Sequence, residues 1–273
     1  KNAAAPIQLC SVDTLIARNK KKSIPMPQAD LVVIDEAHFA CSASFLWVIS
    51  QYPNAYFLPV TATPHVKKGL RHVADQVVYP ISLRELISQG YLVPPRYFAP
   101  PTRINYNEIK IQNGDYNNRQ LADEVVKAQV FGDIIKHYRQ HADGRPAVLF
   151  AVNCEHSRNM VIELNTAGIA AEHVEAETSP KARLEALAKL QSGELRVVSN
   201  VDILCTGVDM PYVSCIIMAR PTKSYNLFIQ QVGRGTRPYE DKKDFIVLDH
   251  ADNVDRHGFI ELPDKISDIT KVI

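Results

Sequence analysis

The stretch from Ala29 to His38, Ala-Asp-Leu-Val-Val-Ile-Asp-Glu-Ala-His, is an apolar run that ends in two adjacent carboxylates. Apolar runs without alternation are typical of strands buried on both faces of a parallel sheet. Residues 56–60 (Tyr-Phe-Leu-Pro-Val) have the same character and lead into Thr61-Ala62-Thr63. Ligands of open α/β sheets bind outside the carboxyl ends of such strands. We therefore predict a parallel sheet with a polar site where these two strands end.

Helix and strand patterns alternate through the rest of the chain. The predicted strands cover residues 147–152, 169–174, 196–199, 213–218 and 245–248, and the predicted helices cover about 119–141, 155–168, 180–193 and 224–232. Ser82 and Glu85 have the spacing of a capping box, Ser179-Pro180 is a helix start, and Gly193 is a helix stop. Alternation of this kind with short connections predicts a second parallel α/β domain.

Prolines separate the two halves. With 273 residues the chain exceeds one domain of ordinary size. Pro94-Pro95 and Pro100-Pro101 cannot continue a helix or donate into a central ladder, so we expect a linker around them. The predicted organisation is residues 1–84 for the first domain, 85–103 for a connector and 104–273 for the second domain.

The composition indicates a soluble globular protein, with 46% hydrophobic and 22% charged residues. Lysine and arginine number 31 against 30 aspartate and glutamate, so the net charge gives no electrostatic argument for a nucleic-acid partner. No apolar run approaches the roughly 20 residues that cross a bilayer. We expect a cytoplasmic protein with no membrane partner.

The chain has five cysteines: Cys10, Cys41, Cys154, Cys205 and Cys215. They form no Cys-x-x-Cys pair and have no histidine at metal-binding spacing, which argues against a zinc site or a disulfide framework.

The carboxylates after the first strand suit phosphoryl transfer. An aspartate at that position can hold Mg²⁺ through its water shell, and the adjacent glutamate can orient or deprotonate the attacking water. These would be Asp35 and Glu36; the alternative is an exposed acidic turn. Thr61 and Thr63 follow the next strand, where their hydroxyls can hydrogen-bond to the carboxylate motif; the alternative is a threonine-proline turn.

The second half has its most specific pattern at residues 230–237, Gln-Gln-Val-Gly-Arg-Gly-Thr-Arg. Two arginines three positions apart at a helix end, Arg234 and Arg237, can both face a γ-phosphate and stabilise its transition-state charge. The alternative is an ordinary glycine-rich turn.

A second polar segment follows the strand predicted at 196–199. Asn200 and Thr206 can contact a nucleic-acid backbone, and Asp209 can contact either a nucleotide ribose or the arginine motif. The alternative is a loop with a helix stop.

Four motifs now stand in one order: 35–38, 61–63, 206–209 and 230–237. They resemble motifs II, III, V and VI of superfamily 2 helicases. The stretches 81–95 and 248–258 resemble the corresponding segments of bacterial and phage DEAH-type DNA helicases. The resemblance covers nearly the whole chain.

The resemblance implies an α/β fold of tandem RecA-like parallel-sheet domains, with ATP and Mg²⁺ in the cleft between them and nucleic acid across both. Asp35 would then hold Mg²⁺ and Glu36 would handle the water. His38 and Gln230 would couple the domains, and Arg234 with Arg237 would reach the phosphates. Further nucleotide contacts would come from Thr61, Thr63, Gly207 and Asp209. Nucleic-acid contacts would come from Thr14, Asn153, Asn200 and Thr206.

The family pattern is incomplete at one point. Such a motor needs a phosphate-binding loop, Gly-x-x-x-x-Gly-Lys-Ser/Thr, and none of the eleven glycines is followed by lysine and then serine or threonine. We therefore expect the chain to begin inside the first motor domain, which would be truncated at its N-terminus. It should hydrolyse ATP poorly alone, and its incomplete sheet should contact the missing N-terminal segment or self-associate.

The leading hypothesis is a fragment of an ATP-dependent helicase or translocase that acts on nucleic acid, with DNA favoured over RNA by the form of the motifs. One alternative is a catalytically inactive nucleic-acid-binding or scaffolding module. Another is a small-molecule NTPase with no nucleic-acid partner.

Overall fold

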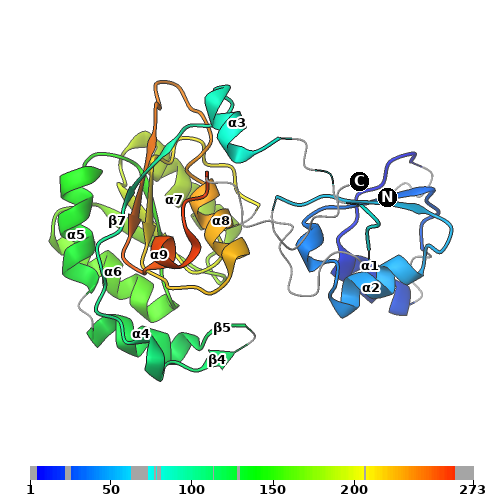
Figure 1. Cartoon of the computed structure of the whole chain (residues 1–273), viewed down its shortest axis with the longest axis horizontal. Helices are drawn as coiled ribbons and strands as arrows, with labels where there is room; N and C mark the ends of the chain where they lie inside the picture. Colours follow the sequence, from blue (N-terminus) through cyan, green and yellow to red (C-terminus); the bar gives the residue numbers. More distant parts are fainter. Residues whose placement is uncertain are drawn as a thin grey trace. The chain divides into compact units, whose positions relative to one another are not determined.

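The computed structural model describes residues 5–21, 26–62, 73–76, 78, 81–112, 114–127, 130–205 and 207–261. The chain divides into two compact units between Tyr79 and Pro80 (Figure 1). The described residues up to Val78 form the first unit, and those from Ile81 to Glu261 form the second. In the described part, no helix is long and apolar enough to cross a membrane.

The first unit pairs two parallel strands with two helices that contact each other. Its elements are α1 (Val12–Lys20), β1 (Leu31–Ile34), the 3₁₀ turn η1 (Ala37–Phe39), α2 (Ala43–Ser50) and β2 (Tyr56–Pro59). Leu31 of β1 lies opposite Tyr56 of β2 in the ladder. Helix α1 begins at Ser11, whose hydroxyl accepts a hydrogen bond from the Thr14 amide at 3.2 Å.

One face of the β1–β2 pair is open. Leu31, Val33 and Leu58 are each more than half exposed, and Tyr56 is 81% exposed. The prediction that these strands are buried on both faces is therefore wrong for this unit, because only one face packs, against a small core around Ile34. Among the described residues, no element covers the other face.

The second unit is built on six parallel strands in the order β3-β10-β9-β6-β8-β7. The strands are β3 (Pro95–Phe98), β6 (Ala147–Phe150), β7 (Ala171–Val174), β8 (Val197–Asn200), β9 (Cys215–Met218) and β10 (Phe245–Asp249). The predicted parallel α/β sheet is confirmed, and the ends of five of its strands, all except β3, lie within two residues of those predicted.

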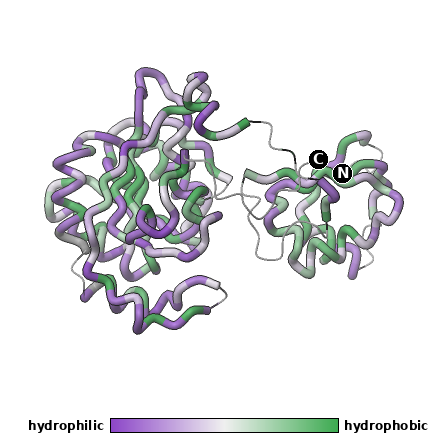
Figure 2. Tube along the Cα trace, viewed as in Figure 1, coloured by the Kyte–Doolittle hydropathy of each residue, from purple (hydrophilic) through white to green (hydrophobic). Residues whose placement is uncertain are grey.

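Helices cover both faces of this sheet. Helices α4 (Asn118–Lys127), α5 (Val130–His141) and α6 (Cys154–Thr166) contribute to the core on one face, and α7 (Pro180–Ser192), α8 (Tyr225–Gly233) and α9 (Asn253–His257) to the core on the other. Successive residues of β6 enter the two cores in turn: Ala147 and Leu149 one, Val148 and Phe150 the other. Burial on both faces is why the strand sequences show no alternation, and Figure 2 shows these strands as the hydrophobic centre of the unit.

Local capping signals were predicted correctly. Ser82 accepts from the Glu85 amide at 3.2 Å and its own amide donates to Glu85 Oε2 at 2.9 Å, which completes the capping box of α3 (Leu83–Ser88). Ser179 caps α7, and Gly193 ends that helix with a φ of 82°. The helix predicted over 119–141 corresponds to α4 and α5, and residues 128–129 between them lie outside the described residues.

The stretch expected to be a connector, 85–103, holds strand β3, paired in parallel with β10. Proline is tolerated here because Pro95 is the first residue of an edge strand, where one side of the backbone needs no ladder partner. After β3 come a 3₁₀ turn η2 (Tyr106–Glu108) and the hairpin of β4 (Ile111–Gln112) and β5 (Asp115–Tyr116).

Candidate functional site

The carboxylates Asp35 and Glu36 follow β1 directly, as predicted. Asp35 is exposed, and its Oδ1 accepts a hydrogen bond from the Glu36 amide at 2.9 Å. Glu36 has left-handed backbone angles, φ 51° and ψ 47°. A non-glycine residue in this region costs on the order of 1–3 kcal/mol, and such strain persists mostly at functional sites. The turn thus presents two acidic side chains at the end of a parallel strand.

His38 links this turn to the end of β2. Its side chain is only 6% exposed, and its Nδ1 lies 3.2 Å from Thr61 Oγ1 and 3.3 Å from Glu36 Oε2. Burial lowers the pKa of His38, and the Glu36 charge opposes that shift. The hydroxyl after β2 therefore contacts the histidine of the acidic motif. Thr63, the second hydroxyl predicted there, lies outside the described residues.

Thr14 is exposed in the first turn of α1, where the Ser11 hydroxyl donates to its Oγ1 at 2.8 Å. A hydroxyl at a helix N-terminus, beside amides without partners in the helix, can bind a phosphate group. Its predicted contact with a nucleic-acid backbone stays a prediction.

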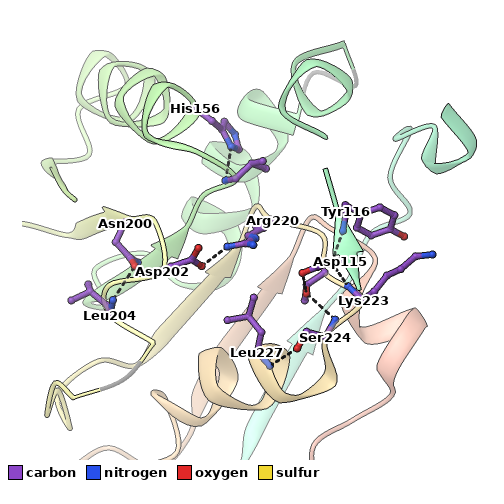
Figure 3. Close-up of polar contacts among 12 residues, drawn as sticks. Asp115, Tyr116, His156, Asn200, Asp202, Leu204, Arg220, Lys223, Ser224 and Leu227 are labelled. Carbon is purple, nitrogen blue, oxygen red and sulfur yellow. Dashed lines mark hydrogen bonds and ion pairs between the residues drawn. The ribbon is translucent and has the colours of Figure 1, made fainter. Parts of the chain in front are cut away.

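In the second unit, Asn200 at the end of β8 is fully buried. Its Nδ2 donates to Leu149 O at 3.0 Å and its Oδ1 accepts from the Leu204 amide at 3.2 Å (Figure 3). This amide is engaged with the backbone of its own unit and does not reach the surface where a nucleic acid would lie. Its evident effect is to shape the loop that follows β8.

The two arginines of the 230–237 motif have different surroundings. Arg234 Nε donates to Cys205 O at 2.9 Å and Nη1 donates to Val208 O at 2.7 Å, so its guanidinium holds the 205–208 loop. Arg237 is half exposed and paired with Asp209. The second of the two alternatives for Asp209, contact with the arginine motif, is therefore observed.

The other residues of these motifs have mixed placements. Gly207 has a φ of 71°, a conformation that favours glycine, and Gln230 is half buried on α8. A side chain at Gly235 would overlap the ring of Phe245, so this glycine is explained by packing and not by the approach of a ligand. Thr206 lies outside the described residues.

Asn153 follows β6 and caps α6, accepting from the His156 amide at 2.7 Å. It lies at the carboxyl edge of the sheet, where a ligand of a parallel α/β domain is expected.

The loop after β9 was missed from the sequence. Arg220 pairs there with Asp202 of the loop after β8. Thr222 Oγ1 donates to Asp115 Oδ2 at 2.6 Å, and the Lys223 amide donates to Asp115 Oδ1 at 2.7 Å (Figure 3). The signal was available, because polar residues again follow an apolar run, but the partner Asp115 is more than a hundred positions away.

The segment after β10 clamps the same loop. Asn253 is fully buried, accepts from the Thr222 amide at 2.9 Å and donates to Arg220 O at 2.9 Å. Asp249 accepts from the Val254 amide at 2.6 Å, and burial raises its pKa to about 6. The stretch 248–258, noted for its resemblance, thus has a structural explanation in its own unit.

Residues 127–238 match the protein family described as helicase conserved C-terminal domain. A 51.5 kDa protein of a Lactococcus phage (isolate 7-9) is 32% identical over 91% of this chain, which spans 54% of that protein. A Saccharomyces cerevisiae protein provisionally named ATP-dependent helicase IRC3 is 27% identical over 88% of the chain, which spans 36% of it. The chain therefore spans about a third to a half of the length of these relatives.

Among solved structures, the chain resembles a fragment assigned provisionally to the HsdR subunit of a type I restriction enzyme from Vibrio vulnificus YJ016. The TM-score is 0.69 at 24% identity, over 91% of this chain and 50% of that one. At this identity the likeness shows the fold alone, which is that of RecA-like domains.

Proposed function

We propose that this chain, whose residues 127–238 match the helicase conserved C-terminal domain, belongs to the superfamily 2 helicases and forms part of an ATP-dependent helicase or translocase. The observation that carries the proposal is the arrangement at the end of β1, where His38 lies between Glu36 and Thr61. Through His38, the carboxylate of Glu36, which could act in phosphoryl transfer, is linked to the end of strand β2.

In this proposal Asp35 holds Mg²⁺ through water, and Glu36 orients or deprotonates the attacking water. The exposed carboxylate of Asp35 fits such an ion, since Mg²⁺ prefers oxygen ligands and keeps much of its water shell. The ion would supply positive charge to the phosphate oxygens. His38 and Gln230 would then couple the two domains.

Arg234 and Arg237 have different roles. Arg237 reaches the γ-phosphate, because its guanidinium is exposed and its present partner, Asp209, is an exposed anion that a phosphate can replace. Arg234 supports it by holding the 205–208 loop, which contains Gly207.

We further propose that nucleic acid crosses both units, with contacts from Thr14, Asn153 and Thr206. DNA is favoured over RNA on the form of the 230–237 motif and the 81–95 segment. The open face of β1 and β2 would contact the rest of the first motor domain or a second copy of the chain. The 273-residue chain alone would turn over ATP poorly. All five cysteines are free, which fits a reducing cytoplasm.

The test is ATP hydrolysis by the full-length protein, with and without single-stranded and duplex DNA. We expect DNA to stimulate turnover, and Glu36→Gln to lower stimulated turnover by about 10²–10⁴-fold, the range for loss of a group that handles a proton. Glu194→Gln changes an exposed glutamate after α7 and is the matched control, with turnover unchanged. If no nucleic acid gives ATP turnover, the motor hypothesis is wrong and the protein is an inactive nucleic-acid-binding module. If turnover does not depend on nucleic acid, a small-molecule NTPase is favoured.

A further inference from the structure

A thiol, an imidazole and a carboxylate meet at the outer edge of the second unit's sheet. Cys154 is the first residue of α6, His173 is in the edge strand β7, and Glu175 follows that strand. One ligand atom from each lies within 4.8 Å of the others, and all three residues are partly buried. Because α6 packs on β7, residues about twenty positions apart come together, which no Cys-x-x-Cys spacing would reveal. The absence of a Cys-x-x-Cys pair therefore does not exclude a metal site here.

The His173 ring is held in a fixed orientation. Its Nδ1 lies 2.6 Å from the Ser157 hydroxyl, which lies 2.6 Å from the fully buried Ser199 hydroxyl. If the proton is on Nδ1, the ring donates to Ser157 and Ser157 donates to Ser199. Nε2 then carries a lone pair. In metal sites the second ring nitrogen is held by this kind of outer hydrogen bond.

Nε2 of His173 is buried and has no hydrogen-bond partner in the described structure. Its nearest acidic atom is Glu175 Oε2 at 3.5 Å, beyond the usual range of an N–H···O hydrogen bond. Two nitrogen or oxygen ligands of a tetrahedral Zn²⁺ at ordinary bond lengths lie about 3.4 Å apart. The separation therefore suits two ligands of one ion better than a direct hydrogen bond.

The charges balance for a divalent ion. The Cys154 thiol lies beside the Glu175 carboxylate. Arg158 also pairs with Glu175, at 2.7 and 2.9 Å to the two carboxylate oxygens, from a half-exposed position. One oxygen can turn to an ion while the other stays with Arg158. Loss of the thiol proton would then give two negative ligands and one neutral ligand.

We propose that Cys154, His173 and Glu175 form a binding site for one Zn²⁺ ion, with water completing the tetrahedron. The mixture of thiolate, imidazole and carboxylate suits a borderline divalent transition metal and not Mg²⁺. On binding, the Cys154 S–H bond breaks, an S–Zn bond forms and one proton passes to solvent. The ion ties the N-terminal end of α6 to the edge strand β7, next to Asn153 at the candidate nucleic-acid edge.

The experiment is a titration of the chelator-treated, reduced 273-residue chain with Co²⁺, followed by displacement with Zn²⁺. A thiolate ligand gives a sulfur-to-cobalt charge-transfer band. We expect the band to saturate at one equivalent, to disappear in Cys154→Ser and to remain in Cys41→Ser, the matched control from the first unit. Zn²⁺ binding should release about one proton per ion at neutral pH.

Two further variants keep the test decisive if Cys154→Ser is poorly folded, which far-UV circular dichroism will show. His173→Gln should weaken Co²⁺ binding at least tenfold, since it removes a ligand. Ser157→Ala should weaken it by about 10–100-fold while keeping the band, because only the outer hydrogen bond is lost. No band in the wild type, or a band that persists in folded Cys154→Ser or is unchanged in folded His173→Gln, overturns the proposal.

Discussion

Replacing Arg234 with lysine tests whether this arginine is a structural brace. The guanidinium donates from three nitrogens to Cys205 O and Val208 O. Lysine keeps the charge but has a single nitrogen and cannot span both carbonyls. Hydrogen bonds that involve a charged group contribute about 1.5–3 kcal/mol each, and Arg234 is partly exposed, so we take the lower figure. Loss of two such bonds predicts that Arg234→Lys destabilises the second unit by about 3 kcal/mol.

The assay is urea unfolding of the 273-residue chain followed by two signals. Far-UV circular dichroism reports both units, whereas fluorescence of Trp47, the single tryptophan, reports α2 of the first unit. With a urea dependence of roughly 2 kcal/mol per molar, the transition of the second unit should move down by about 1.5 M. The Trp47 transition should stay in place, because the substitution lies in the other compact unit.

Arg237→Lys is the matched control. This arginine pairs with Asp209 at the surface, and exposed ion pairs contribute about 0–1 kcal/mol. Its unfolding curve should therefore stay close to that of the wild type, while its ATP turnover in the full-length protein falls. If Arg234→Lys and Arg237→Lys unfold at the same urea concentration, the brace assigned to Arg234 is refuted.

Two other predictions concern the stability of the second unit. Gly235→Ala should lower its free energy of unfolding by about 1–3 kcal/mol, because the added methyl overlaps the Phe245 ring; unchanged urea unfolding would contradict this. Burial lowers the pKa values of His156 and His250 to about 4, so the stability they contribute is complete above their unfolded pKa and is lost as the pH falls toward 4. Asp249 has its pKa raised to about 6 and acts in the opposite sense: its contribution to the stability of the second unit increases as the pH falls through 6. The two histidines together outweigh the carboxyl, so the second unit should be about 2 kcal/mol less stable at pH 5 than at pH 7; equal urea midpoints at the two pH values would sink the argument.

Features that depend on residues close together in the chain, such as helix ends, could be predicted from the sequence. Ser82 with Glu85, and Ser179 with Gly193, act within a few positions, so the ends of their helices could be predicted directly. The positions of the other five strands of the second unit's sheet, β6 to β10, followed in the same way, because burial on both faces leaves apolar runs. Prolines were less informative. Pro95 was predicted to lie in a linker, but it is the first residue of an edge strand.

The surroundings of the site side chains could not be predicted, because they depend on contacts between residues far apart in the chain. The burial of Asn200 is set by Leu149, some fifty positions earlier, and the contacts of Arg234 are with a loop nearly thirty positions away. Motif spacing shows that such side chains matter, but not whether they face a ligand or their own backbone. The metal ligands proposed around Cys154 were missed for the same reason.

The order of the six-stranded sheet also determines when the second unit can be completed during synthesis. Among the described strands β3 pairs only with β10, and Phe245 is paired with Pro95, 150 positions earlier. At ordinary elongation rates β3 leaves the ribosome roughly 8–30 s before its partner. Until β10 arrives, β3 has no neighbour in this sheet and the edge of β9 is bare, so a nascent chain that stalls before residue 245 presents β3 and the edge of β9 unpaired to other chains.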